Sequence, residues 1–152
     1  MIEISSIYFN MIRNQLGLGT ITGFSQVAEL QVVRDHMKRG RDISAKHIEI
    51  FGSLLSEDLL PSASSWSTQP TASTTAPFSD KLMMLQVSAL ISSSIAHYGS
   101  SIGTSQRRDL ATHYTRLMAE LAAYAEDSAN IMIDHGWLEE PPQAVDRDQL
   151  AK

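Results

Sequence analysis

The sequence predicts an all-α fold, a four-helix bundle with a long crossover between its second and third helices. Two observations predict it. Residues 60–79 form an uncharged stretch rich in Ser, Thr and Pro, and the segments on either side repeat apolar residues at helical spacing. A loop of this length is uncommon inside a compact domain. A crossover that spans the length of a bundle does need such a loop.

The first two helices are predicted over about residues 3–27 and 30–57, and Pro61 ends this half of the bundle. Three glycines weaken the first helix and indicate either close approach by another backbone or a kink: Gly17, Gly19 and Gly23. The predicted core stripes are Ile4, Ile7, Met11, Leu18 and Ile21 on the first helix, and Val32, His36, Ile43, His47, Ile50 and Leu54 on the second. Asn14 lies on the stripe of the first helix, where we expect a polar core residue with its hydrogen bonds satisfied. We expect Trp66 and Phe78 to anchor the crossover.

The third helix is predicted over about residues 80–100, with Ser79 or Asp80 as its N-cap. It has a large apolar stripe and an uncharged small face, so we expect it to be buried on most sides; the small face comprises Ala89, Ser92, Ala96, Gly99 and Gly103.

The fourth helix is predicted over about residues 105–135, after a turn at 99–105 and capped by Thr104 or Ser105. Gly136 suits its end. Its inward residues are Leu110, Tyr114, Leu117, Leu121, Tyr124 and Ile131. Four helices with one long crossover have the connectivity of ferritin-like proteins.

The length of 152 residues suits one domain with a substantial core, which we expect over residues 1–145, followed by a frayed tail at 146–152. The net charge of −5 gives no general electrostatic reason to bind nucleic acid, and acidic residues interleave with the basic ones at residues 34–42 and 107–109. The absence of cysteine excludes disulfides, thiolate metal sites and thiol catalysis.

Several blocks of sequence occur together in one known family. They are residues 76–84 (APFSDKLMM), 97–99 (HYG), 107–114 (RRDLATHY), 117–120 (LMAE) and 136–142 (GWLEEPP). Over nearly its whole length the chain resembles the repeat unit of the family catalogued as domain of unknown function 3231, found in spore-forming Gram-positive bacteria. The resemblance implies a ferritin-like bundle, loosely related to spore coat protein F. Members commonly carry two such bundles, and this chain resembles the second. The resemblance implies no active site.

The usual metal site of ferritin-like bundles is missing from the sequence. That site needs a Glu-x-x-His pair from each of two helices and a carboxylate from each of the other two. None of the five histidines has an acidic residue three positions before it, and the first and third predicted helices carry no mid-helix carboxylate. No nucleophile elbow or phosphate-binding glycine loop is present either. We therefore expect no di-iron site, no cofactor and no enzyme activity.

A non-standard metal site is the alternative that the residues leave open. His97 and His113 flank the predicted turn between the third and fourth helices, Asp109 lies four residues before His113, and His47 is on the core stripe of the second helix. Two histidines and a carboxylate suit iron or zinc. The interpretation that we favour is that these histidines are partly buried and hydrogen-bonded to hydroxyl groups.

We expect a non-catalytic bundle with a structural or protein-interaction role, linked to sporulation only through the resemblance. The small face of the third helix and the glycines of the first predict pairing with a second copy or with a tandem repeat. A ligand carrier with a pocket lined by Tyr98, Tyr114 and Tyr124 stays open. No apolar run reaches the ~18–20 residues of a membrane span, and no signal peptide is visible, so we expect a cytoplasmic protein.

Overall fold

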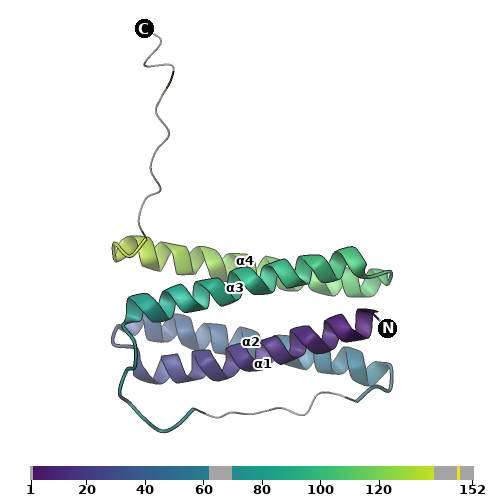
Figure 1. The fold of residues 1–152 in the computed structure, drawn as a ribbon, viewed down its shortest axis with the longest axis horizontal. Coiled ribbons are helices and arrows are strands. Elements are labelled where there is room, and N and C mark those ends of the chain that lie inside the picture. Colours follow the sequence, from purple (N-terminus) through teal and green to yellow (C-terminus); the bar gives the residue numbers. More distant parts are fainter. Residues whose placement is uncertain (1, 62–69, 139–146, 148–152) are drawn as a thin grey trace.

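In a computed structural model of the protein, which describes residues 2–61, 70–138 and 147, the chain forms an antiparallel bundle of α-helices (Figure 1). The helices are α1 (Ile2–Val27), α2 (Gln31–Glu57), α3 (Asp80–Thr104) and α4 (Arg108–Asp134). The described residues contain no strand. Helix α2 ends at one end of the bundle and α3 begins at the other end (Figure 1). The all-α four-helix fold and its long crossover are thus confirmed.

The four helices form two helical hairpins that repeat one geometry. Helices α2 and α4 have the same length, and α4 begins and ends 77 residues after α2 (31 to 108 and 57 to 134). Helix α1 packs against α2 and α3, and α3 packs against α4. The bundle is therefore a pair of similar α-hairpins, α1–α2 and α3–α4, joined by the crossover.

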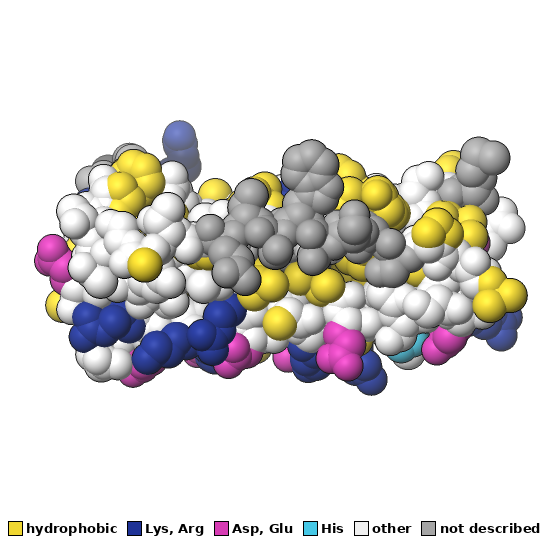
Figure 2. All heavy atoms as spheres, turned by 90° about the horizontal axis from the view of Figure 1, so that it is seen from below, with side chains coloured by type: hydrophobic (Ala, Val, Ile, Leu, Met, Phe, Trp, Pro, Cys, Tyr) yellow, Lys and Arg dark blue, Asp and Glu magenta, His cyan; other side chains and the backbone are white. Residues whose placement is uncertain are grey.

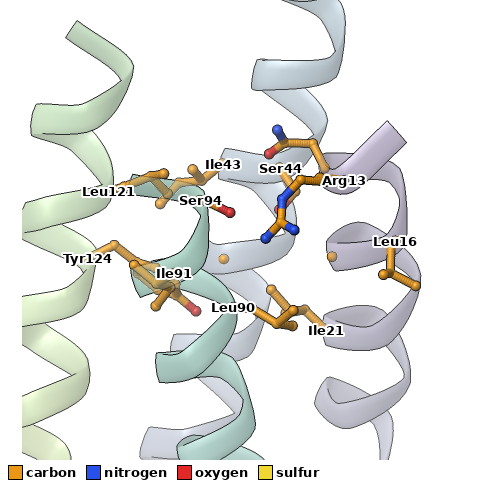
Figure 3. A pocket seen from close by; sticks show the side chains of 13 residues that line it. Arg13, Leu16, Ile21, Ile43, Ser44, Leu90, Ile91, Ser94, Leu121 and Tyr124 are labelled. Carbon is orange, nitrogen blue, oxygen red and sulfur yellow. The ribbon is translucent and has the colours of Figure 1, made fainter. Parts of the chain in front are cut away.

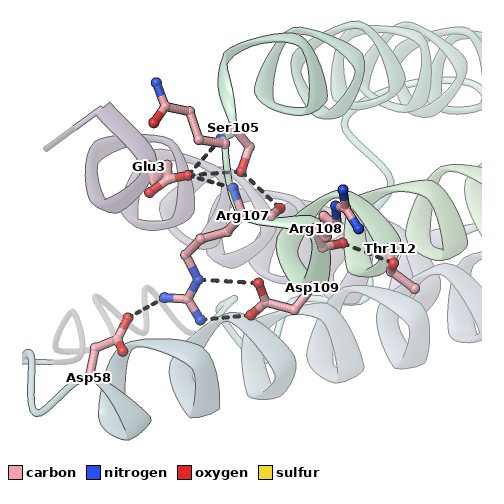
Figure 4. Close-up of polar contacts among 8 residues, drawn as sticks. Glu3, Asp58, Ser105, Arg107, Arg108, Asp109 and Thr112 are labelled. Carbon is pink, nitrogen blue, oxygen red and sulfur yellow. Dashed lines mark hydrogen bonds and ion pairs between the residues drawn. The ribbon is translucent and has the colours of Figure 1, made fainter.

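Each hairpin uses a carboxylate to cap a helix of the other. Asp80, in the first turn of α3, accepts hydrogen bonds from the backbone N–H groups of Glu29 and Leu30 at 3.0 and 2.8 Å, just before α2. Glu3, in the first turn of α1, accepts from those of Gln106 and Arg107 at 2.8 and 3.1 Å, just before α4 (Figure 4). The two sets correspond position by position at the same 77-residue interval. Acceptors at these free N–H groups stabilise the starts of α2 and α4.

The cap residues differ in part from those expected. Ser79 caps α3 as predicted, because its hydroxyl accepts from the N–H of Leu82 at 3.3 Å. Helix α4 begins at Arg108 without a side-chain cap of its own, so the prediction of Thr104 or Ser105 in that role is wrong. Helix α3 runs through the region predicted as a turn and ends at Thr104.

A charged bridge joins the end of α2 to the start of α4. The guanidinium group of Arg107 pairs with Asp58 and Asp109, each at 2.7 Å (Figure 4). These interactions hold the pKa of the Asp109 carboxyl below its usual value, because the hydrogen bond from Arg107 favours the charged form. Asp109 is therefore committed to a structural ion pair.

The core contains most of the predicted stripes and one glycine that packing requires. A side chain at Gly40 on α2 would overlap the ring and hydroxyl of Tyr124 on α4, so glycine lets this aromatic residue lie against the backbone. Phe78 lies edge-on to Phe24, with ring centroids 6.4 Å apart, so this end of the crossover is anchored. Trp66 lies outside the described residues, as does the predicted tail apart from residue 147.

Two predicted core residues and one predicted buried face are exposed instead. Ile4 and Val32 are 41% and 42% exposed, so their placement in the core stripes is wrong. The small face of α3 also faces outward, with Ala89, Ser92, Ala96 and Gly103 exposed. The expectation that α3 is buried on most sides therefore does not hold within one copy of the chain.

The outer surface is divided into a charged half and an apolar half. Helices α2 and α4 follow the amphipathic pattern of surface helices, with many charged residues outward. Helix α1 carries only Glu3 and Arg13 as charged residues, and α3 carries only Asp80 and Lys81. In Figure 2 most of the charged side chains gather along one edge of the view, and hydrophobic side chains are visible over much of the rest.

Candidate functional site

A chain of hydrogen bonds through the middle of the bundle takes one side chain from each helix. Asn14 on α1 donates through Nδ2 to the hydroxyl of Tyr98 on α3 at 2.7 Å. That hydroxyl lies 2.9 Å from Nδ1 of His47 on α2. Nε2 of His47 lies 3.0 Å from a carboxylate oxygen of Glu120 on α4. Lys46 completes the chain at the surface by donating to the other oxygen of Glu120 at 2.7 Å.

The donors and acceptors of this chain fit one protonation pattern. The Glu120 carboxylate accepts the proton of Nε2 of His47, so Nδ1 of the neutral ring is an acceptor. The Tyr98 hydroxyl therefore donates to Nδ1 and accepts from Asn14. Burial lowers the pKa of His47, against the opposing effect of Glu120, and so favours this neutral imidazole. Burial raises the pKa of Glu120, but hydrogen bonds from Lys46 and His47 outweigh it and hold that pKa below its usual value. Glu120 is therefore the charged end of the chain.

Two smaller polar clusters lie beside this chain. Asn10 donates to the hydroxyls of Ser101 and Tyr114 at 3.0 and 3.4 Å. The ring of His36 stacks on Tyr124 with centroids 4.2 Å apart, and its Nε2 lies 2.7 Å from the hydroxyl of Ser128. Desolvation lowers the pKa of His36 to about 4, so this imidazole is neutral at physiological pH. All three clusters hold helices of the two hairpins together.

A cavity of about 60 Å³ lies between the four helices, next to Asn14 (Figure 3). Its walls are mainly apolar, and its polar lining includes the side chains of Arg13, Ser44 and Ser94. In Figure 3 the guanidinium group of Arg13 reaches from α1 toward the space beside Ser94. Tyr124 lines this cavity, whereas the expected Tyr98 and Tyr114 do not.

The structure does not bring the four predicted metal ligands together. His47 is fully buried between Tyr98 and Glu120, and Asp109 is paired with Arg107. The ring of His97 packs edge-on against Phe9 at 5.0 Å, on the side of α3 that faces α1. His113 is half-buried on α4. Among the described residues no group of three His, Cys, Asp or Glu side chains could hold a metal ion.

The sequence reasoning identified His47 and Asn14 as core polar residues but missed two others that matter to the site. Glu120 is three residues after Leu117 on the core stripe of α4, a position that could have indicated an inward-reaching carboxylate. Arg13 is the one basic residue of α1 and is flanked by uncharged sequence. A single charge on an otherwise uncharged helix could have indicated a residue with a specific role. Of the three histidines in the interpretation that we favoured, His47 lies 2.9 Å from a hydroxyl, that of Tyr98. The ring of His97 instead packs against Phe9.

Chemically, this arrangement is suited to specifying the packing of the bundle. A buried polar network in which each group has a partner fixes the relative positions of the elements that contribute to it. Its members are held by one another inside the bundle, and none of them is placed as a free nucleophile beside the cavity.

Comparisons with known proteins give a family and a fold. The model of a family described as protein of unknown function (DUF3231) matches residues 1–150. No curated protein matches the chain. The crystal structure of a protein from Bacillus halodurans C-125, described as a "putative spore coat protein", superposes with a TM-score of 0.84 at 15% identity, covering 95% of this chain and 94% of that one. At this identity the similarity shows the fold alone. None of the described helices is long and apolar enough to cross a membrane.

Proposed function

The chain belongs to the DUF3231 family of proteins of unknown function, and from this premise we propose that it is a non-catalytic structural module that pairs with a second copy of itself. The observation that carries the proposal is the apolar surface of α1 and α3. We define the α1/α3 face as the outward side chains of Phe9, Ile12 and Leu16 on α1 and of Leu82, Leu85, Ala89 and Ala96 on α3. All seven are exposed in the single chain.

The composition of the α1/α3 face supports a second copy as the occupant. Three of the four charged residues of these helices lie near a helix end, namely Glu3 on α1 and Asp80 and Lys81 on α3. The fourth, Arg13, lies in the middle of α1. A face with so little charge can meet itself across a twofold axis with little like-charge repulsion. The small residues of α3 would let the larger side chains of α1 from the other copy approach closely.

The two helices that carry the face are long enough for a dimer interface of standard size. The 26 residues of α1 extend for about 39 Å at about 1.5 Å per residue. Two adjacent helices of about 10 Å diameter give a footprint of about 800 Å². A standard interface buries about 800 Å² on each partner, so a dimer of standard size would extend beyond the seven residues of the α1/α3 face along the full length of α1 and α3.

A role in the spore is the cellular setting that best fits the comparisons. The protein from Bacillus halodurans C-125 has the same fold and is described as a "putative spore coat protein". A coat is a protein assembly, and a bundle with one apolar face suits a role in an assembly. We therefore propose spore association for this chain.

Charge placed on the α1/α3 face tests this proposal. The double variant Ile12→Glu/Ala96→Glu adds two carboxylates to positions that are exposed in the single chain, so the bundle should still fold. The matched control is Ala45→Glu/Ala122→Glu, which adds the same charge to exposed positions of α2 and α4. In sedimentation equilibrium the wild type and the control should be dimers and the first variant a monomer. A first variant that stays dimeric would place the interface elsewhere.

A further inference from the structure

One charged side chain reaches toward the interior of the bundle without an acidic partner. Arg13 donates from Nη2 to the hydroxyl of Ser93 at 2.8 Å, and its Cζ lies 5.7 Å from the ring centroid of Phe9. Its Nε is buried and has no hydrogen-bond partner among the described residues. No ion pair of Arg13 with a described carboxylate is present. A guanidinium group in this position has donors available and a charge that nothing nearby balances.

The cavity beside Arg13 has the surroundings of an anion site. No Asp or Glu is among the described residues that line it. The hydroxyls of Ser44 and Ser94 line the same space, and the rest of the wall includes Leu90 and Ile91 from α3. Apolar walls strengthen the attraction between a guanidinium group and an anion, because they lower the local dielectric constant. A carboxylate matches the planar fork of donors that Arg presents.

We propose that this cavity binds a short-chain monocarboxylate, with its carboxylate at Arg13 and Ser94 and its alkyl group against Leu90 and Ile91. The volume limits the size of the ligand. A cavity of about 150 Å³ holds benzene and a water takes about 30 Å³ of liquid, so about 60 Å³ accommodates a carboxylate with one or two further carbons. The cavity lies within one copy of the chain, so this inference does not depend on the dimer.

Titration with sodium propionate tests the site, with propionamide as the neutral analogue of the same shape. Binding is followed by two-dimensional ¹H–¹⁵N NMR of the whole chain, through the backbone amides of Ser44 and Ser94, in a buffer without other carboxylates. Propionate should shift both amides along a saturable curve in the millimolar range, whereas propionamide should not. Equal shifts with the two compounds would overturn the proposal, because the charge of the ligand would then have no effect.

Two variants and a control locate the binding at Arg13. Arg13→Met keeps an unbranched apolar stem and removes the charged guanidinium group, and should weaken propionate binding at least tenfold. Arg116→Met removes an exposed charge from α4 and should leave binding unchanged. Ser94→Leu fills the cavity while keeping Arg13, and should also abolish the shifts, so the test does not depend on the folding of one variant. Wild-type affinity in a folded Arg13→Met or Ser94→Leu protein would overturn the proposal.

Discussion

At the scale of single residues, the hydroxyl of Tyr98 connects three of the four helices. It accepts from Asn14 on α1 and donates to His47 on α2, while the tyrosine itself is on α3 and is 1% exposed. Burial raises the pKa of this hydroxyl well above its ordinary value, so it stays protonated and can donate. Loss of the hydroxyl would leave Nδ1 of His47 without its partner and would remove one of the two acceptors of Asn14.

Substitution of Tyr98 by Phe should therefore destabilise the bundle more than the same change at Tyr114. The expected loss for Tyr98→Phe is about 2–3 kcal/mol, because the buried Nδ1 of His47 loses its partner and Asn14 loses one of its two. Tyr114 is equally buried, but its hydroxyl makes a longer bond of 3.4 Å to Asn10, so Tyr114→Phe should cost about 1 kcal/mol. Urea unfolding of both variants measures the difference. Equal losses in the free energy of unfolding would show that the hydrogen bonds of Tyr98 stabilise the bundle no more than that of Tyr114.

The sequence predicted single residues well where periodicity decides burial and poorly where a contact comes from another helix. His36, His47 and Asn14 are buried as their place on the stripes predicts. Their partners Glu120 and Ser128 were not predicted, because a hydrogen bond across the bundle depends on the axial register of two helices. That register is absent from the apolar pattern of either helix alone.

At the scale of elements, α2 and α4 begin without side-chain caps of their own and rely on the other hairpin. Their N-cap residues are Leu30 and Arg107, neither of which makes a side-chain cap bond. The acceptors come from Asp80 and Glu3 instead. Formation of one hairpin thus stabilises the helix start of the other.

Removal of the Asp80 carboxylate tests this coupling between hairpins. Asp80→Ala should cost about 1–2 kcal/mol, because the N–H groups of Glu29 and Leu30 lose their acceptor in a position where Asp80 is 8% exposed. The control Glu49→Ala removes an exposed carboxylate from α2 and should change the free energy of unfolding by less than about 0.5 kcal/mol. Chemical denaturation followed by circular dichroism measures both. A loss no greater than that of the control would argue against capping between hairpins.

The four helices and most of their ends could be predicted from the sequence. The residues that cap the helix starts could be predicted only in part. The first helix begins and ends within one residue of its expected bounds, since Ile2–Val27 was expected over 3–27. Helix α3 was expected to stop near residue 100, because Gly99 and Gly103 indicated a turn. Both glycines are helical. A side chain at Gly103 would meet no atom within 4 Å, and one at Gly99 would make only an ordinary contact with Met118, so packing within one chain does not require glycine at either position.

At the scale of the whole molecule, the bundle has a charged half and an apolar half. Ion pairs lie along α2 and α4, as between Arg39 and Asp127 and between Lys46 and Glu120. The α1/α3 face has exposed apolar side chains instead, among them Phe9 at 47% and Leu16 at 62% exposed. A contiguous apolar face on a single chain is typical of a surface that another protein covers.

The outward position of the small face of α3 was not predictable from one helix. A helix that is apolar all round is typical of a buried helix, and the pattern of α3 does not distinguish burial within one chain from burial between chains. The structure places α3 at a corner of the bundle, with its small face outward. The same composition that predicted burial therefore indicates an interface.

The most direct measurement of the central claim is the mass of the wild-type protein in solution. Light scattering coupled to gel filtration, over a concentration series reaching tens of micromolar, should give a mass of twice the 16.8 kDa of the chain. The mass should stay at that value in high salt, because the α1/α3 face is apolar and ionic screening has little effect on it. A mass of 16.8 kDa at tens of micromolar would contradict the account, because the α1/α3 face would then be stable in water without a second copy.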